Sequence, residues 1–278
     1  MVKLNIDSTI QFTSGREIPR LGFGVFKIDQ GDTKASVLAA LHAGYRHIDT
    51  AQLYENEKEV GQAIRESGIP RTQIFVTTKM MSDGKDLQSA RKAINDSLER
   101  LDIDYIDLFL IHEPRAGKTV RLLIWQALIE AKKAGKAKDI GVSNFNVNHM
   151  EEFKAAGLEL PVVDQVELHP LDQQRPIVEW CKKHNIVVEA YCPLIRGGFD
   201  IPVLQELSRK YDKQPAQILV RWSLQRGFVP LPKSSNAGRI QSNADVYSFD
   251  LSPADVRKLD ALDKGDAGAI SWNPIHYP

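Results

Sequence analysis

Four side chains that can hold or transfer a proton stand at or just after the ends of predicted strands. Asp49 and Lys79 end two apolar runs, and His112 directly follows a third. Tyr54 stands in the loop after Asp49. Neighbouring parallel strands lie about 4.8 Å apart, so three consecutive strand ends span only about 10 Å. If these strands are parallel neighbours, the four side chains meet at one edge of the sheet.

The lysine determines which chemistry this group would support. A charged side chain is rarely buried without a partner, and Asp49 on the neighbouring strand is the natural counter-charge for Lys79. An ammonium group beside a tyrosine favours the phenolate, so we expect Lys79 to lower the pKa of Tyr54 from its usual value of about 10. Tyr54 could then donate a proton near neutral pH while His112 orients and polarises a substrate oxygen, which fits the reduction of a carbonyl by hydride addition. Taken singly, each residue is more commonly a loop cap, a satisfied core residue or a solvated charge; their coincidence on consecutive strand ends favours catalysis.

The usual sequence signatures of nucleotide binding are missing. Gly22-Phe23-Gly24 lacks the third glycine of the dinucleotide fingerprint, and the chain has no P-loop. Tyr54 and Lys58 match the Tyr-x-x-x-Lys spacing of short-chain dehydrogenases. Without a glycine-rich N-terminal turn, we interpret that match as accidental. A hydride donor must therefore bind elsewhere.

The C-terminal third offers a phosphate site. Residues 231–236 follow the last predicted strand and open a helix that carries Arg239 and Asn243. Phosphate sites of α/β barrels use the loops after the seventh and eighth strands together with a helix N-terminus, where free N–H groups face the anion. Lys233 and Arg239 would add two positive charges there. The alternative is a helix cap with solvated basic residues.

Apolar runs alternate with amphipathic stretches along nearly the whole chain. The expected strands cover residues 20–24, 45–49, 74–79, 106–111, 137–142, 162–166, 186–191 and 228–231. The expected helices cover residues 33–43, 58–66, 87–101, 121–134, 147–156, 177–184, 202–211, 215–225, 237–244 and 252–262. Such alternation predicts an all-parallel sheet, because right-handed crossovers place the helices outside it. Eight strand–helix units favour a closed α/β fold, a (β/α)8 TIM barrel with extra C-terminal helices, formed by residues 1–278 as one domain.

Composition and charge narrow the class of protein. The chain has 278 residues, 42% of them hydrophobic, and its 36 Lys and Arg balance its 36 Asp and Glu. A net charge of zero argues against nucleic-acid or membrane-surface partners, since both need excess positive charge. No run approaches the roughly 18 apolar residues of a membrane span, and the N-terminus lacks the apolar core of a secretory signal. With Cys181 and Cys192 as the only cysteines, we expect a soluble cytoplasmic monomer without disulfides or a metal site.

Several sequence blocks, in order along nearly the full chain, resemble the aldo-keto reductase family. They are residues 44–51 (GYRHIDTA), 54–57 (YENE), 78–79 (TK), 110–112 (LIH), 141–145 (GVSNF) and 232–234 (PKS). The chain is most similar to the microbial and fungal branch that includes diketogluconate reductases and yeast-type carbonyl reductases. This resemblance implies a barrel that uses NADPH without a Rossmann domain.

The resemblance also implies roles for individual residues. Tyr54 would be the general acid, Lys79 and Asp49 would tune it, and His112 would orient the substrate. The residues implied in NADPH binding are Ser143, Asn144 and Gln165 at the nicotinamide amide, Tyr191 stacked on its ring, Pro193 and Leu194 in the following loop, Lys233, Ser234 and Arg239 at the 2′-phosphate, and Asn243 at the adenine. Without the family pattern, Tyr191 would be an ordinary strand end, and Asn144 and Gln165 would be ordinary loop-end amides.

Phe26, Glu113 and Trp272 are the expected lining of the substrate pocket. Glu113 stands where many relatives of this kind place an aromatic residue, and an ionised carboxylate there would repel anionic substrates. We therefore expect a preference for small or hydroxylated aldehydes and ketones. Cys192, next to Pro193, is expected to be structural. The loop over residues 194–201 is short, which argues against a long clasp over the cofactor.

The sequence thus predicts an NADP-dependent oxidoreductase that reduces an aldehyde or ketone to the alcohol. Hydride would go to the carbonyl carbon and a proton from Tyr54 to its oxygen. Two alternatives stay open: a polyol or secondary-alcohol dehydrogenase that runs oxidatively, and a nucleotide-sensing regulatory subunit with little turnover. The complete set of Tyr54, Lys79, Asp49 and His112 argues against the regulatory subunit.

Overall fold

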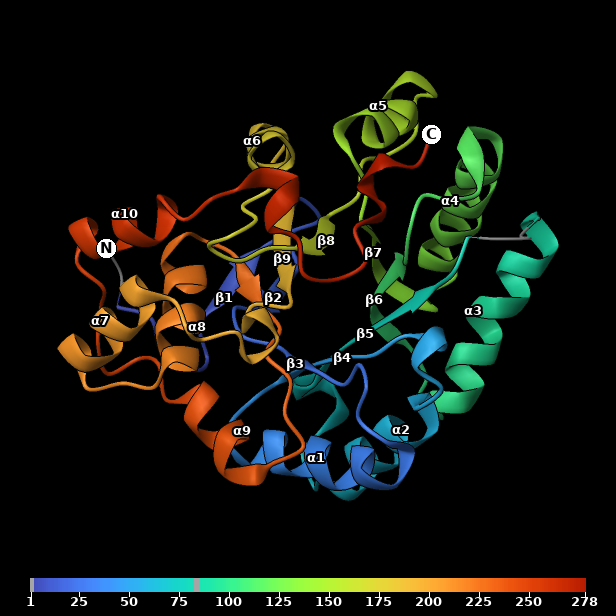
Figure 1. The fold of residues 1–278 in the computed structure, drawn as a ribbon. Helices are drawn as coiled ribbons and strands as arrows, with labels where there is room; N and C mark the ends of the chain where they lie inside the picture. The colour runs from blue at the N-terminus through green and yellow to red at the C-terminus, as the bar shows by residue number, and fades with distance from the viewer. Residues whose placement is uncertain (1–2, 83–85) are drawn as a thin grey trace.

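A closed ring of parallel strands lies at the centre of the computed structural model, which describes residues 3–82 and 86–278 (Figure 1). The strands follow one another in ring order as β3 (Phe23–Gly24), β4 (His47–Asp49), β5 (Phe75–Met80), β6 (Ile106–Ile111), β7 (Ala137–Ser143), β8 (Val163–Glu167), β9 (Val187–Tyr191) and β10 (Val229–Pro230). Backbone bonds from Gly22 N to Pro230 O (3.1 Å) and from Gly24 N to Pro232 O (3.2 Å) join the two outer strands and close the ring. The predicted (β/α)8 barrel is confirmed.

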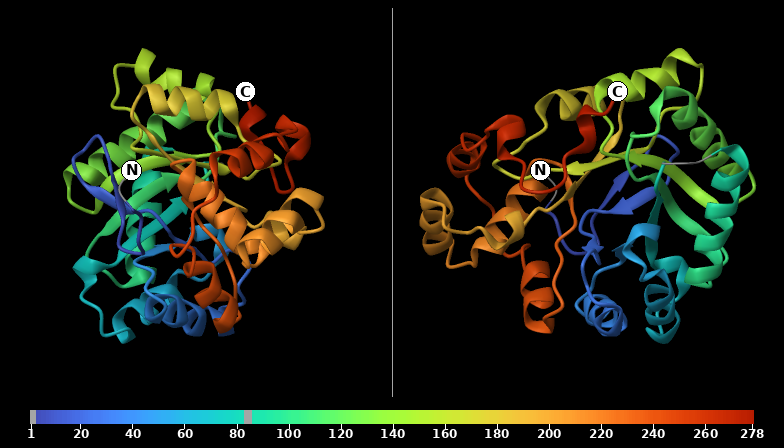
Figure 2. Two further views of the ribbon diagram at one scale, coloured as in Figure 1. Left: turned by 90° about the vertical axis from the view of Figure 1, so that its left-hand side faces the viewer. Right: turned by 45° about the vertical axis from the view of Figure 1, so that its right-hand side comes forward.

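Helices surround the ring on its outside, as the rotated views in Figure 2 also show. In chain order they are α1 (Gln30–His42), α2 (Glu57–Glu66), α3 (Leu87–Leu101), α4 (Gly117–Lys133), α5 (Val147–Ala155), α6 (Arg175–Lys183), α7 (Pro202–Tyr211), α8 (Pro215–Gln225) and α9 (Ala237–Ala244). In α3, buried side chains recur at helical spacing, at Ala90, Ala93, Ile94, Ser97 and Leu101. That spacing gives the helix one face to pack on the sheet.

The predicted extra C-terminal elements are present. They comprise α10 (Pro253–Asp260) and a tail that contains two short 3-10 turns, Gly265–Gly268 and Pro274–His276. The tail passes over the barrel and ends beside α4 and α5 (Figure 1). There Arg121 Nη1 donates to Pro278 O at 2.7 Å, and His149 Nε2 lies 2.7 Å from Tyr277 O. The chain end is therefore fixed to the barrel wall.

A short hairpin, absent from the predicted elements, closes the amino ends of the strands. β1 (Thr9–Gln11) pairs antiparallel with β2 (Glu17–Pro19). Phe12 and Ile18 from this hairpin pack with Phe75, Leu108 and other apolar side chains in a core inside the ring. Phe75 is the first residue of β5, so the hairpin covers the end of the barrel opposite the carboxyl ends of the strands. This leaves the carboxyl ends as the open face.

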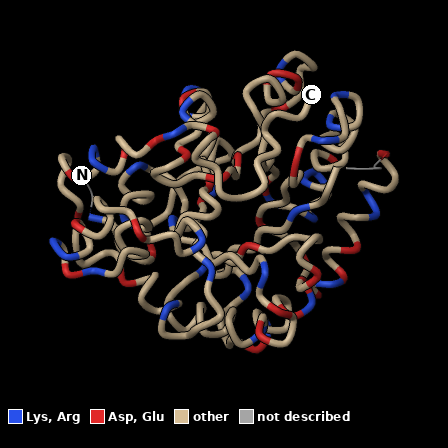
Figure 3. Tube along the Cα trace, viewed as in Figure 1, with Lys and Arg blue, Asp and Glu red and all other residues tan. Residues whose placement is uncertain are grey.

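The first barrel strand is shorter than predicted. Residues 20–22 were expected to belong to it, but Arg20 N donates to Ser8 O in the hairpin region at 2.9 Å. Positive and negative residues are interspersed over the molecule (Figure 3), in keeping with the zero net charge of the chain. Within the described residues, no helix is long and apolar enough to pass through a membrane.

Candidate active site

The structure brings the four proton-handling residues together at the carboxyl ends of three neighbouring strands. Asp49 ends β4, Lys79 lies one residue before the end of β5, and His112 directly follows β6. Tyr54 comes from the 3-10 turn Gln52–Tyr54 that follows β4. The rings of Tyr54 and His112 are 5.6 Å apart between centroids.

Lys79 is the centre of this group. Its side chain is fully buried, and its Nζ donates to Asp49 Oδ1 at 2.7 Å, to Thr50 O at 2.9 Å and to Tyr54 Oη at 3.3 Å. Burial disfavours the charged form of Lys79, but Asp49 and Tyr54 outweigh it and raise its pKa. Lys79 therefore stays charged, and its ammonium group stays in contact with the phenol oxygen of Tyr54.

The pKa of Tyr54 differs in direction from the prediction. Burial raises the pKa of Tyr54 to about 12, because loss of water around the phenolate outweighs the lowering by Lys79. Asp49 contributes further to the rise. The structure thus corrects the expectation of a lowered pKa, and Tyr54 holds its proton at neutral pH. Burial and the charge of Lys79 also lower the pKa of His112 well below its usual range, so this imidazole is neutral.

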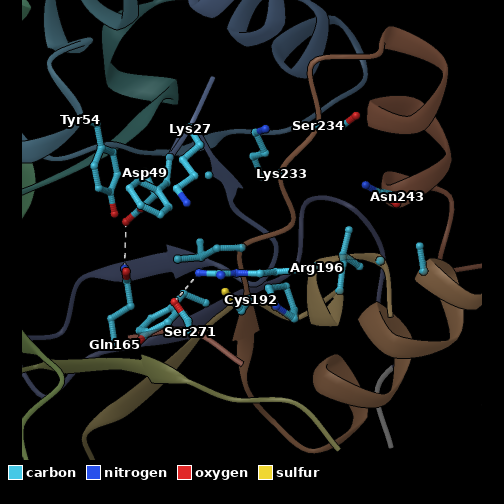
Figure 4. A pocket seen from close by; sticks show the side chains of 18 of the residues that line it. Lys27, Asp49, Tyr54, Gln165, Cys192, Arg196, Lys233, Ser234, Asn243 and Ser271 are labelled. Atoms are coloured by element: carbon cyan, nitrogen blue, oxygen red, sulfur yellow. Dashed lines mark hydrogen bonds between the residues drawn. The ribbon is translucent and has the colours of Figure 1, made fainter. Parts of the chain in front are cut away.

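A cavity of about 830 Å3 opens over these residues (Figure 4). Tyr54, Asp49 and His112 line it, while Lys79 lies behind them. All ten expected cofactor residues also line it, namely Ser143, Asn144, Gln165, Tyr191, Pro193, Leu194, Lys233, Ser234, Arg239 and Asn243. In Figure 4 Tyr54 and Asp49 lie at one end of the cavity, Ser234 and Asn243 lie at the other, and Lys233 lies between them. The cavity can therefore hold an elongated ligand.

The cavity is basic, including its end at Ser234, where Arg239 lies. Four cationic side chains line the cavity, Lys27, Arg196, Lys233 and Arg239, and among the described lining residues Asp49 is the one carboxylate. Since Asp49 is paired with Lys79, the lining carries a positive excess. Arg239 Nε donates to Ser234 Oγ at 3.3 Å, and the Asn236 side chain caps α9 by accepting from Arg239 N at 3.0 Å. This end can bind an anion.

Amide and hydroxyl groups line the cavity beside Asp49 and His112. Ser143 Oγ donates to Gln165 O at 2.7 Å, and Asn144 Nδ2 donates to His112 O at 3.0 Å. Asn144 has a φ of 63°, a left-handed conformation that asparagine tolerates better than most residues. Tyr191 Oη lies 2.8 Å from Asn144 Oδ1 and 3.0 Å from Trp272 O. These contacts fix the polar groups that face the cavity.

The structure places Glu113 away from the cavity, although we expected it to line the substrate pocket. Its carboxylate is fully buried and accepts from Ser82 Oγ at 2.6 Å, Ser82 N at 3.1 Å and Arg115 N at 2.6 Å. These bonds turn the side chain toward the loop after β5 and away from His112. The expectation of repulsion against anionic substrates therefore loses its basis. Phe26 and Trp272, by contrast, do line the cavity.

The C-terminal tail contributes contacts that the sequence analysis missed. Glu167, at the end of β8, accepts from Ile270 N at 2.6 Å and from Ser271 N at 3.0 Å. Arg196, in the loop after β9, donates to Ser271 Oγ at 2.7 Å across the cavity (Figure 4). The short loop thus reaches the tail through one side chain. Its position after the seventh strand was the signal that could have marked Arg196.

The fold and the site together define a barrel enzyme with a long ligand cleft at the carboxyl ends of its strands. The chain belongs to the aldo/keto reductase family, whose model matches residues 20–264. It is 42% identical to the glyoxal reductase of Bacillus subtilis (strain 168), over 94% of this chain and 95% of that protein. It is 40% identical to the methylglyoxal reductase DkgA of Escherichia coli (strain K12), over 93% and 94% of the two chains.

A solved structure shows the same architecture. The aldo-keto reductase of Bombyx mori in complex with NADP superposes with a TM-score of 0.90 at 34% identity, over 99% of both chains. The resemblance drawn from the sequence blocks is therefore confirmed. The chain is an aldo-keto reductase, an oxidoreductase that acts on carbonyl groups.

Proposed function

We propose that this chain reduces small aldehydes and ketones to alcohols with NADPH, and that 2-oxoaldehydes such as glyoxal and methylglyoxal are its first candidate substrates. The observation that carries the proposal is the contact of Tyr54 Oη with the buried Lys79 Nζ, at 3.3 Å, at one end of a cavity whose other end is basic. The names of the two bacterial relatives point to the same class of substrate.

The residues present fit the cofactor. NADPH has two anionic regions, its 2′-phosphate and its diphosphate, and the cavity carries four cationic side chains. In this proposal Lys233, Ser234 and Arg239 bind the 2′-phosphate, and Asn243 binds the adenine. The residues that hold the nicotinamide end are Ser143, Asn144, Gln165 and Tyr191, with Pro193 and Leu194 in the loop between the two ends. When bound, NADPH supplies the hydride.

Proton transfer in this proposal rests on the chain's own groups. The neutral imidazole of His112 donates a hydrogen bond to the substrate oxygen and orients the carbonyl. Tyr54 Oη gives its proton to that oxygen as the carbon accepts hydride, and negative charge moves onto Tyr54. Lys79 stabilises this charge, and Asp49 keeps Lys79 charged and in place.

The protonated state of Tyr54 is compatible with its role as the acid in reduction. With a pKa of about 12, Tyr54 is protonated at neutral pH and ready to act as an acid. A polyol or alcohol dehydrogenase would need the phenolate as a base, and that form is scarce at neutral pH. Since the same groups serve both directions of a reversible reaction, the proposal of reduction rests on a cellular NADPH ratio that favours it.

The rim of the cavity near Tyr54 carries apolar side chains. Phe26, Leu53 and Trp272 line it and are exposed to 41%, 50% and 38% respectively. Phe26 packs on Tyr54 with ring centroids 4.8 Å apart. Apolar side chains around the phenol favour small carbonyl compounds. Since one chain supplies all of these groups, we propose that the enzyme acts as a monomer of a single domain, which size-exclusion chromatography with light scattering would test.

The direct test is the loss of NADPH absorbance with methylglyoxal. Tyr54→Phe removes the proposed acid and is expected to abolish turnover while NADPH still binds. Tyr105→Phe, a tyrosine outside the cavity, is the matched control and should keep wild-type turnover. A wild-type protein that binds NADPH without turnover on a panel of carbonyl compounds would favour the regulatory alternative.

A further inference from the structure

Glu189 is a buried acid that the proposed mechanism does not use. It lies in the middle of β9 with no exposed surface, and it is the register partner of Gln165 on β8. It does not line the cavity, whereas Gln165 does. Glu189 can therefore influence a bound ligand only through its neighbours.

Both amide hydrogens of Gln165 are used inside the barrel. Gln165 Nε2 donates to Asp49 Oδ2 at 2.8 Å and to Glu189 Oε2 at 2.9 Å. An amide nitrogen carries two hydrogens, so Gln165 has none left for the cavity. The side-chain group that Gln165 can offer a ligand is its carbonyl oxygen, which can only accept a hydrogen bond.

The orientation of this amide is set by charge. Asp49 forms an ion pair with Lys79 Nζ at 2.7 Å, and a carboxylate accepts hydrogen bonds without donating any. A flipped Gln165 would place its oxygen against Asp49 Oδ2 and lose the bond that its NH2 group now donates there. Figure 4 shows Gln165 reaching across the barrel to Asp49, with the bond drawn as a dashed line.

Asp49 by itself would leave the second amide hydrogen of Gln165 free. That hydrogen could then turn toward the cavity and bind an acceptor on a ligand. Glu189 takes up this hydrogen, and its other oxygen lies 3.5 Å from His47 Nε2. That second oxygen makes no hydrogen bond within the described residues, since His47 Nε2 bonds Thr77 Oγ1 at 3.0 Å, so Gln165 is the hydrogen-bond partner of the Glu189 carboxyl group.

We propose that Glu189 is a positioning residue that makes Gln165 an obligate hydrogen-bond acceptor, so that the nicotinamide site selects a ligand group bearing N–H. The inference rests on the proposed use of NADPH. A primary carboxamide meets the requirement, because its NH2 can donate to Gln165 Oε1. A methyl ketone in the same place has no hydrogen to donate, and a carboxylate would place oxygen against oxygen.

The test compares direct binding of NADP+ with that of its 3-acetylpyridine analogue, in which a methyl ketone replaces the carboxamide. Wild-type protein should bind NADP+ about tenfold more tightly than it binds the analogue, which is the effect of one hydrogen bond. Glu189→Met removes the acceptor and should reduce this ratio to about twofold. Glu189→Gln keeps an acceptor oxygen and should restore the wild-type ratio. Isothermal titration calorimetry gives both dissociation constants without turnover.

A wild-type ratio near one, or an unchanged ratio in a folded Glu189→Met variant, would overturn the assignment and leave the reductase proposal intact. Failure of wild-type protein to bind NADP+ would overturn both the assignment of Glu189 and the reductase proposal. A second measurement needs neither a variant nor a ligand: both side-chain amide protons of Gln165 should exchange with water much more slowly than those of an exposed glutamine such as Gln88, as followed by 15N NMR. Fast exchange of either proton would overturn the assignment.

Discussion

Lys79 Nζ lies 2.7 Å from Asp49 Oδ1, and neither side chain has more than slight exposure to water. The same ammonium donates to Thr50 O and to Tyr54 Oη. Its three hydrogens therefore all point at oxygens of the chain, and its position relative to the phenol is fixed. The ion pair is at once the electrostatic partner of Tyr54 and a buried charge pair that is costly to break.

Replacing Lys79 by methionine should remove activity and weaken the fold. The change leaves Asp49 as an unpaired buried carboxylate, so we expect the free energy of unfolding to fall by about 3–5 kcal/mol. Because the variant lacks the ammonium that stabilises negative charge on Tyr54, its kcat/KM for methylglyoxal should fall by about 10²–10⁴-fold. Denaturant unfolding and initial rates measure the two effects. Lys58→Met, at an exposed position on α2, is the control. Near-normal turnover in a folded Lys79→Met variant would contradict the role of the ion pair.

Replacing Arg239 by alanine should weaken the binding of NADPH much more than the binding of NADH. Arg239 lines the basic end of the cavity, and the two cofactors differ by the 2′-phosphate that this end is proposed to bind. Loss of a charge-assisted hydrogen bond should raise the dissociation constant of NADPH by about tenfold or more. Fluorescence titration with each cofactor measures the change, and Arg257→Ala on α10 is the control. Equal weakening of NADH and NADPH would show that the 2′-phosphate binds elsewhere.

Replacing Glu167 by glutamine should affect the carbonyl substrate and spare the cofactor. Glu167 holds the backbone of Ile270 and Ser271, and the next residue, Trp272, lies 6.3 Å from His112 between ring centroids. A glutamine offers one acceptor oxygen where the carboxylate offers two, so the tail should loosen. We expect KM for methylglyoxal to rise about threefold to tenfold, with the dissociation constant of NADPH unchanged. Amide exchange at residues 270–272 should speed up in parallel, whereas Glu179→Gln on α6 should change neither quantity.

The stability of the protein should depend on pH through Glu189. Burial, with a further contribution from Asp49, raises the pKa of Glu189 from 4.5 to about 8, against lowering by Gln165 and Lys79. The folded state therefore binds this proton more tightly than the unfolded chain does. It follows that the contribution of Glu189 to the free energy of unfolding is greatest below about pH 4.5 and is lost as the pH rises to about 8.

The glutamine of the Glu189→Gln variant cannot ionise, so the variant should lack this pH-dependent contribution to the free energy of unfolding. Denaturant unfolding at a series of pH values should show the variant gaining stability relative to wild type between about pH 5 and pH 8. A difference between the two proteins that stays constant over this range would mean that Glu189 keeps the same protonation state on unfolding.

Helix boundaries and strand order were predictable because their signals are local. The predicted bounds of α3, α7, α8 and α9 agree with the structure. Pro202 and Pro215 begin two of these helices, and side chains of Asp86 and Asn236 cap the other two. Such positions set helix ends with little help from distant parts of the chain. The hairpin of β1 and β2 escaped prediction because each of its strands contributes a single large apolar residue, Ile10 or Ile18.

The identity of the residues at the strand ends was predictable, but their environment was not. That Glu113 turns away from the cavity depends on Ser82, 31 positions earlier in the chain. The direction of the pKa shift of Tyr54 depends on how much water the finished cavity excludes. The bond between Gln165 and Asp49 joins strands on opposite sides of the barrel, 116 positions apart. Each of these features is set by packing between distant segments, which no local pattern encodes.

The hairpin that seals one end of the barrel has a practical consequence for using the protein as a catalyst. Its loop, residues 12–16, lies on the face turned away from the cleft, where a Cβ added at Gly15 would meet no atom within 4 Å. An anchoring group attached there would tether the molecule to a solid support with its entrance facing the medium. Reagents would then reach an immobilised preparation as freely as they reach the dissolved one.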